Sequence, residues 1–167
     1  MNILYYLKLG MALFLSFSNP VIEYKPDYFI IHTTLSNILT DDMIQLLHSG
    51  MDFEFQIYSS LRNENDKNQI IINRFFKKIS YNRIEKQYII HDINEKRFNT
   101  LQEAIIELKT FYFKYPLNNT TKIKYSFFCE VSIQPDEFME SNFSIKTMEL
   151  WSNYKPGMTC TFTTGEH

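Results

Sequence analysis

The chain is short of the small residues on which several common kinds of site depend. Its 167 residues include only four glycines, five prolines and two cysteines. The glycines are too scattered to build the phosphate-binding loops of P-loop or dinucleotide-binding proteins. No serine lies in a G-x-S-x-G elbow, and the cysteines form no C-x-x-C pair. These absences exclude nucleotide binding by those loops and hydrolysis by that elbow.

The chain also lacks an excess of basic charge. Seventeen Lys and Arg residues against nineteen Asp and Glu residues give a net charge of -2. Proteins that bind nucleic acid neutralise phosphates with clustered basic side chains, so we expect no nucleic-acid partner. The densest basic stretch contains Arg74, Lys77, Lys78 and Arg83, and we interpret it as a solvated strand edge that is protected by charge.

Residues 1–18 have the features of an export signal. One charge, Lys8, precedes an apolar run that is too short to span a bilayer but suits the core of a signal peptide. Small side chains at Ser16 and Ser18 predict cleavage directly after Ser18. A proline two residues further on argues against cleavage, so an uncleaved membrane anchor formed by residues 3–17 is the alternative. A buried first helix of a cytosolic protein is a third interpretation. The sequence therefore favours export, to the periplasm or the outer face of the inner membrane.

The rest of the chain is predicted to hold a linker and one strand-rich domain. Residues 19–26 contain two prolines and are predicted to be an extended linker. The domain then occupies residues 27–167. Apolar and polar residues alternate clearly in residues 51–60 and 121–133, which is typical of strands with one buried face. Further strands are expected at residues 27–35, 70–79, 84–93 and 158–163, with a join near 81–83 and a turn at 94–97.

Two helices are expected between these strands. The first begins after Thr40, a good N-cap, and ends at Gly50. The second begins with a capping box, Thr100 to Glu103, and is expected to end by Tyr115, before a proline. Six or seven strands, two short helices and no regular βαβ alternation predict a mainly β or α+β fold. We expect an antiparallel sheet or β-sandwich with the helices packed on it.

Two aromatic clusters are candidates for an interaction surface. Phe111, Tyr112, Phe113 and Tyr115 place four aromatic rings within five residues. One helical face and one core can bury only some of them, so one or two are candidates for an exposed interaction patch. Packing in the core is the leading interpretation of the cluster. The second candidate is the late segment that contains Trp151 and Tyr154, which either caps the core or anchors a partner.

The two cysteines, Cys129 and Cys160, both fall on the apolar face of a predicted strand. In an oxidising compartment, they are candidates for a disulfide across the core. The alternative is that both are small buried hydrophobic residues. A catalytic thiol is disfavoured because no histidine or basic residue lies close in sequence to lower its pKa.

No other residues form a recognisable catalytic or metal-binding pattern. His32 and His91 lie on predicted strands and would have to meet through the fold to bind a metal ion. The carboxylates Asp52, Glu54 and Glu130 lie on polar strand faces, where a solvated charge is the simpler explanation. We therefore expect no catalytic residue, metal site or cofactor.

Three stretches of the chain resemble a known family, the exported bacterial domains of unknown function numbered 4390. They are Leu46–Gly50 running into Met51–Phe55, Phe98–Ala104 opening a helix, and Trp151 with Ser152. The resemblance covers about residues 27–163 and rests on mostly structural motifs. It implies export after a signal sequence and no established activity, so it assigns no functional residues.

The leading hypothesis from the sequence is a non-enzymatic exported domain that binds another envelope or membrane protein. Such a domain would be an accessory or scaffold part of a membrane-associated assembly. The alternative is a module that binds a small apolar ligand or lipid between the sheet and the helices. A cavity lined by Phe53, Phe55, Phe127 and Leu108 would favour that alternative, and a filled core would not.

Overall fold

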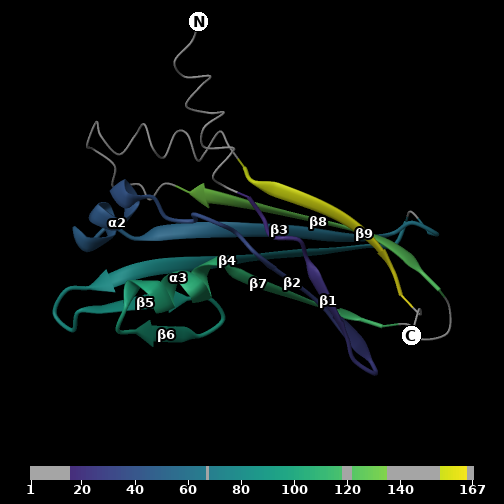
Figure 1. Ribbon diagram of the computed structural model, residues 1–167, viewed down its shortest axis with the longest axis horizontal. Helices are drawn as coiled ribbons and strands as arrows, with labels where there is room; N and C mark the ends of the chain where they lie inside the picture. The colour runs from purple at the N-terminus through teal and green to yellow at the C-terminus, as the bar shows by residue number, and fades with distance from the viewer. Residues whose placement is uncertain (1–15, 67, 118–121, 135–154, 165–167) are drawn as a thin grey trace, which may run out of the picture.

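The computed structural model describes residues 16–66, 68–117, 122–134 and 155–164, and its strands form two antiparallel sheets. The smaller sheet has the order β1 (Val21–Tyr24), β2 (Tyr28–Thr34), β7 (Thr110–Pro116). The larger sheet has the order β6 (Glu95–Phe98), β5 (Gln87–His91), β4 (Ile70–Asn82), β3 (Phe53–Asn63), β8 (Lys124–Gln134), β9 (Gly157–Thr163). The smaller sheet crosses the larger one (Figure 1).

The core lies between the two sheets. On β3, the residues at alternate positions from Phe53 to Asn63 are buried, whereas the residues between them are partly or fully exposed. Apolar side chains of β2, β7 and β8 meet this buried face, among them Phe29, Ile31, Phe113, Phe127 and Val131. The predicted antiparallel, mainly β fold with two helices is confirmed, although the described part of the chain contains nine strands instead of six or seven.

The prediction that residues 19–26 form an extended linker is wrong, because they include strand β1. Val21–Tyr24 pairs with Phe29–His32 of β2. The chain reverses between the two strands, where the Lys25 N–H donates to the Tyr28 carbonyl at 2.8 Å. The two prolines lie outside β1, so neither removes a hydrogen bond from it. This segment is therefore part of the folded domain.

The turns around β5 also differ from the prediction. The Asn82 side chain accepts hydrogen bonds from the backbone N–H groups of Ile84 and Glu85, each at 3.0 Å. This local turn lengthens β4 to Asn82 and places Ile84, which was predicted in a strand, in a turn where it is 94% exposed. The residues of the predicted turn at 94–97 mostly form β6, which pairs with β5.

Both helices begin where the sequence predicts. Helix α2 (Asp41–His48) begins after Thr40, whose hydroxyl accepts from the Met43 N–H at 3.3 Å. Helix α3 (Leu101–Lys109) begins with the predicted capping box, in which Thr100 and Glu103 each accept from the other's backbone N–H at 3.3 Å. Helix α2 lies at one end of the sandwich, and α3 lies beside β5 and β6 (Figure 1).

Helix α3 ends earlier than predicted. It stops at Lys109, and the residues expected to complete it, up to Tyr115, form strand β7. In β7, Phe111, Phe113 and Tyr115 are buried, while Tyr112 between them is 65% exposed. The stretch fits a period of two as well as it fits a helix, and pairing with β2 decides in favour of the strand.

A lysine on the core face of β4 joins the larger sheet to the end of α3. Lys77, which we interpreted as solvated, is only 6% exposed and lies opposite Phe55. Its ammonium group donates to the carbonyl oxygens of Glu107 at 2.6 Å and Thr110 at 2.7 Å. The last carbonyls of a helix have no partner within the helix, and a cation is favourable beside them. Burial lowers the pKa of Lys77, and the nearby carboxylates of Glu107 and Asp92 oppose that shift.

We expect Lys77→Met to lower the free energy of unfolding by about 1–3 kcal/mol, because two partly buried carbonyl groups lose their donor. The matched control is Lys78→Met, one residue further on and on the opposite face, where the ammonium group pairs with Asp52 at 2.8 Å in a partly exposed position. That change should cost about 0–1 kcal/mol. Urea denaturation of both variants measures the difference, and an equal loss in the two would contradict the capping role.

Candidate interaction surface

The predicted aromatic patch on residues 111–115 is mostly part of the core. Phe111, Phe113 and Tyr115 are buried, which leaves one exposed ring of the four, within the expected one or two. Tyr112 is exposed, and its ring stacks on His32 with ring centres 4.8 Å apart. The physical reason is the strand geometry, which sends alternate side chains to opposite faces. The other predicted contact residues, Trp151 and Tyr154, lie outside the residues that the structure describes.

The sequence analysis missed a long exposed strand edge. Within β4, strand β5 pairs with Lys78–Asn82 only, whereas strand β3 pairs with β4 from Ile70 to Ile79. Among the described residues, the segment Ile70–Lys77, which we call the β4 edge, therefore has a neighbouring strand on one side only. Four of its apolar side chains are between 42% and 53% exposed, namely Ile70, Ile71, Ile72 and Phe76. An apolar strand edge of this length is an uncommon feature of a soluble surface.

The β4 edge lies beside strand β7, which is itself an edge of the smaller sheet. The Phe75 and Phe113 rings meet with centres 5.8 Å apart. Next to them, the side-chain amide of Asn73 donates to the Tyr115 hydroxyl at 3.2 Å. Burial raises the pKa of Tyr115, so this hydroxyl stays protonated well above neutral pH. The two contacts close the middle of the sandwich along this side.

Two hollows open along the same side, one on each flank of these contacts. The first, the Leu117 hollow, has a volume of about 540 Å³ and is lined by Ile70, Ile71, Leu117 and Tyr125, among others. The second, the Tyr112 hollow, has a volume of about 640 Å³ and includes Phe75, Phe76, Ile93 and Tyr112. Both lie between β4 and the smaller sheet or the segment that follows it. The β4 edge thus passes two partly apolar depressions.

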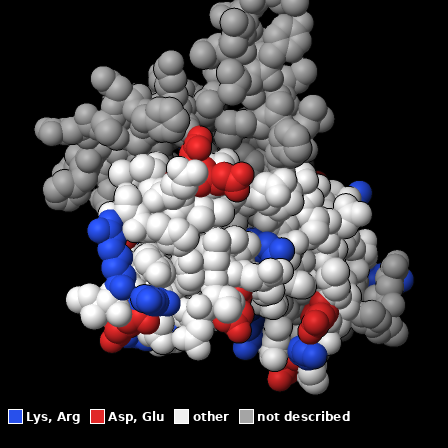
Figure 2. Space-filling view, turned by 60° about the vertical axis from the view of Figure 1, so that its left-hand side comes forward, with Lys and Arg blue, Asp and Glu red and all other residues white. Residues whose placement is uncertain are grey.

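Ion pairs join four of the charged groups that line the Tyr112 hollow. Lys96 pairs with Glu107 at 2.7 Å and with Asp92 at 3.9 Å, and Lys77 lies 3.9 Å from the same Glu107 oxygen. The hydrogen bond that the Lys96 ammonium group donates to Glu107 raises the pKa of Lys96. Arg74 also lines the hollow, so three cationic side chains against two carboxylates leave one positive charge beside its apolar walls. The surface on the side of the helices likewise intermixes acidic and basic side chains (Figure 2).

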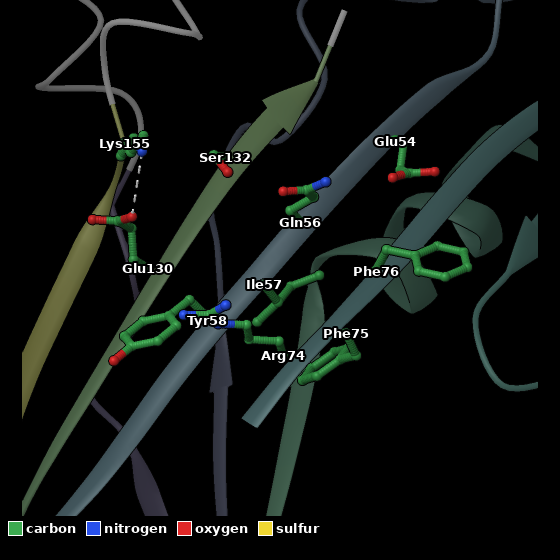
Figure 3. Close-up of a pocket in the computed structure, with 10 residues that line it drawn as sticks. All are labelled: Glu54, Gln56, Ile57, Tyr58, Arg74, Phe75, Phe76, Glu130, Ser132 and Lys155. Atoms are coloured by element: carbon green, nitrogen blue, oxygen red, sulfur yellow. Dashed lines mark ion pairs between the residues drawn. The ribbon is translucent and has the colours of Figure 1, made fainter. Parts of the chain in front are cut away.

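A further pocket of about 460 Å³ lies on the outer face of the larger sheet and contains two of the predicted carboxylates (Figure 3). Glu54 comes from β3 and Glu130 from β8, where Lys155 approaches Glu130 at 4.0 Å. Glu130 lies opposite Tyr58, four positions along β3 from Glu54. Strand geometry then separates the two carboxylates by roughly 14 Å. This exceeds the spacing of a carboxylate pair that works in glycoside hydrolysis.

The histidines considered as metal ligands lie in different sheets. His32 is on β2 and stacks on Tyr112, whereas His91 is on β5 and lies 3.8 Å from Glu95. Within the described ranges, no three His, Cys, Asp or Glu side chains gather closely enough to hold a metal ion.

Cys129 and Cys160 lie on neighbouring strands as free thiols, so the predicted disulfide is absent from the structure. Cys129 is opposite Met158, and Cys160 is opposite Phe127, which makes the cysteines diagonal neighbours on one face. Diagonal positions are about 7–8 Å apart, beyond the usual Cα separation of a disulfide. Burial raises the pKa of Cys129 to about 12 and also raises the pKa of Cys160.

The residues that the sequence analysis expected around an apolar ligand are part of the core. Phe53, Phe55, Phe127 and Leu108 are all fully buried, and Phe127 packs against Phe113 with ring centres 5.1 Å apart. None of the three depressions described above includes any of these four residues. These four residues therefore pack in the core and line none of the three depressions.

Residues on the proposed export signal contact the folded domain. Phe17 forms an antiparallel bridge with Leu35, and its ring lies 6.2 Å from that of Phe111. The Ser18 N–H donates to the Thr34 carbonyl at 2.8 Å, and the Ser18 hydroxyl accepts from the Thr34 N–H at 3.0 Å. No helix within the described residues is long and apolar enough to cross a membrane.

Comparison with known proteins gives one match. The family model Domain of unknown function (DUF4390) matches residues 14–115, which is more than half of the chain. The match begins before the predicted start at residue 27 and ends within β7, so it includes the contacts of Phe17 and Ser18. No curated protein and no solved structure matches.

We expect both cysteines to react as free thiols when the protein is unfolded without a reductant. In the folded protein at pH 8, Cys160 should react with a thiol reagent, whereas Cys129 should not, because the thiolate is the reactive form and burial disfavours it. Titration with a chromogenic disulfide reagent measures both states, and the Cys160→Ala variant assigns the fast thiol. Finding no free thiol in the unfolded protein would show that a disulfide forms.

Proposed function

We propose that the chain, which belongs to the DUF4390 family of domains of unknown function, is an exported domain that binds another envelope or membrane protein. It would act as an accessory or scaffold part of a membrane-associated assembly and would catalyse no reaction. The observation that carries the proposal is the β4 edge with its exposed row of isoleucine and phenylalanine side chains. Exposed apolar surface of this kind marks sites of protein contact.

The arrangement of polar groups supports binding over catalysis. Glu54 and Glu130 are too far apart to share a substrate atom, and the buried Cys129 thiol resists ionisation. Lys77, the most buried charged group described, is engaged by two backbone carbonyls. Each of these groups has a structural role or a solvated position, so the β4 edge is the feature that still calls for a function.

Export is proposed from the N-terminal sequence, and the contacts of Phe17 and Ser18 favour the anchor alternative. The apolar run in residues 3–17 fits a targeting or anchoring segment. Cleavage directly after Ser18 would remove the bridge to Leu35 and the hydrogen bonds to Thr34. Retention of residues 3–17 keeps those contacts and attaches the domain to the outer face of the inner membrane.

A second candidate function, binding of a small apolar ligand or lipid, is favoured by the Tyr112 hollow. The hollow lies between strand β4 and the end of α3, and Phe75, Ile93 and Tyr112 give it apolar walls. An amphiphile would place its chain there and its polar group near Lys96. Native mass spectrometry of the purified protein discriminates the two candidates, because a bound amphiphile adds a defined mass that Tyr112→Asp should abolish.

We expect a photo-crosslinking amino acid at Ile72 to form a discrete adduct with an envelope or membrane protein in intact cells. Ile72 is 53% exposed on the β4 edge, so the probe replaces a side chain that a bound partner would touch. The matched control is the same probe at Ile84, which is 94% exposed in the turn after β4. Mass spectrometry identifies the adducts. Equal adducts at both sites, or none at Ile72, would count against the proposed function.

We also expect the protein isolated from its own cells to retain Ser16, Phe17 and Ser18. The three residues contribute a bridge and several hydrogen bonds to the domain, so the anchored form is the one that keeps the fold intact. Intact-mass analysis of the membrane fraction reads the N-terminus directly. A chain that begins at Asn19 would establish the cleaved signal peptide instead, and a purely cytosolic protein would overturn export.

A further inference from the structure

Resting on the proposed function, we infer that the β4 edge binds an extended segment of the partner by adding it as a strand to the larger sheet. The partner segment carries apolar side chains at two positions four residues apart and an acidic side chain next to one of them. This chemistry follows from the free length of the edge, the placement of the two hollows and the position of Arg74.

The β4 edge offers backbone groups along the eight positions from Ile70 to Lys77. In an antiparallel sheet, each strand directs alternate N–H and C=O groups toward each neighbour. Of the strands that the structure describes, β3 alone pairs with Ile70–Lys77, so the groups on the other side face no described strand. The edge ends at Lys78, where His91 of β5 already occupies the neighbouring position. An incoming strand can thus pair along Ile70–Lys77, and β5 blocks further pairing from Lys78 onward.

The two hollows define the side chains of that strand. Ile71 lines the Leu117 hollow, and Phe75 lines the Tyr112 hollow. They pair with Leu61 and Ile57 on the core face of β3, so both point toward the space between the sheets. Four residues of strand span about 13 Å. Side chains opposite Ile71 and Phe75 would enter the two hollows, while the Phe75–Phe113 and Asn73–Tyr115 contacts fill the space between them.

Arg74 favours an acidic side chain at the facing position of the incoming strand. It points to the outer face, where its guanidinium lies 5.5 Å from the centre of the Tyr58 ring. It forms no ion pair with any carboxylate in the described part of the chain. Opposite charges on directly facing residues of neighbouring strands stabilise the pair. A carboxylate opposite Arg74, next to the apolar residue opposite Phe75, would supply the missing partner.

A second copy of this chain would place no carboxylate opposite Arg74 in a two-fold pairing along the β4 edge. Two-fold pairing of identical antiparallel strands sets residues of the same face opposite one another. A register centred on Arg74 brings two guanidinium groups together, which is unfavourable. A register centred on Asn73 pairs Ile70–Phe76 with the same residues of the copy, but it sets Ile72 opposite Arg74 and so supplies no carboxylate. Registers shifted further outward pair five residues or fewer. The β4 edge is therefore better suited to a segment of a different protein.

The test uses the full-length chain in a mild detergent and the acetylated, amidated peptide Thr-Leu-Glu-Thr-Val-Leu-Thr. In the antiparallel register, its leucines lie opposite Phe75 and Ile71, and its glutamate lies opposite Arg74. We expect saturable binding, with chemical-shift changes and slowed hydrogen exchange concentrated on the backbone amides of Ile70–Lys77. A peptide of the same composition with the leucines moved one position, onto the outer face, should bind at least about tenfold more weakly.

Two protein variants make the assignment specific. Ile71→Lys should weaken binding by about tenfold or more, whereas Ile84→Lys, the same change at an exposed turn, should not. Arg74→Glu should weaken the glutamate peptide and favour a peptide with lysine in its place. This reversal of preference does not depend on stability, so it remains informative if Ile71→Lys unfolds the protein.

The outcomes separate this inference from the proposed function. No saturable binding, equal binding to both isoleucine variants, or shifts outside the β4 edge would overturn strand addition. A dimer that Ile71→Lys dissociates would also overturn it, because a second copy would then occupy the edge. If the crosslink at Ile72 still captures an envelope protein in those cases, the function stands with another binding mode. If that crosslink fails as well, both proposals fall.

Discussion

The aromatic contact between β7 and the larger sheet determines how the candidate surface is built. Phe113 lies against Phe127 of β8 and Phe75 of β4, with ring centres 5.1 Å and 5.8 Å apart. Tyr115 packs on Phe29 and binds Asn73. These contacts bring the edge of the smaller sheet beside the edge of the larger one. If they were lost, the two hollows would no longer lie on one line along β4.

The charge of Lys77 both stabilises and destabilises the fold at the junction of β4, α3 and β7. Its ammonium group is favourable beside the Glu107 and Thr110 carbonyls, but burial penalises the charge and lowers its pKa. Because the folded-state pKa is lowered, the penalty is present while the group is charged. It is relieved as the pH rises through the lowered pKa toward the ordinary value near 10.5. The lysine is therefore better explained by where it holds α3 and β7 than by the net stability it adds.

Much of the fold could be predicted from the sequence because the signals were local. The alternation in β3 and β8, the Thr40 cap and the capping box at Thr100 each depend on residues close together in the chain. The change from α3 to β7 after Lys109 could not be predicted from the sequence, because that stretch has apolar residues at both helical and strand spacings. Only pairing with β2, which is far away in sequence, decides between the two.

The candidate surface was beyond the sequence for a related reason. Ile70–Ile72 and Phe76 are typical of any buried strand, and their exposure follows from the shortness of β5. That length is fixed by the Asn82 turn, which delays the start of β5, and by the reversal after His91 that begins β6. Whether a strand lies at the edge of a sheet depends on which other strands fail to pair with it. The residue pattern of the strand itself does not reveal this.

An apolar edge that stays open must also avoid indiscriminate pairing, and the chain has features that limit it. Charged side chains on an edge, and those that point inward, discourage pairing with other strands. The β4 edge carries Arg74 on its outer face and Lys77 on its inner face, and β5 blocks further pairing from Lys78 onward. A strand that leaves Arg74 without a carboxylate, or places polar side chains in the hollows, gains backbone hydrogen bonds but little else. Selectivity on this surface therefore depends on the side chains of the incoming strand, since the backbone groups would accept almost any sequence.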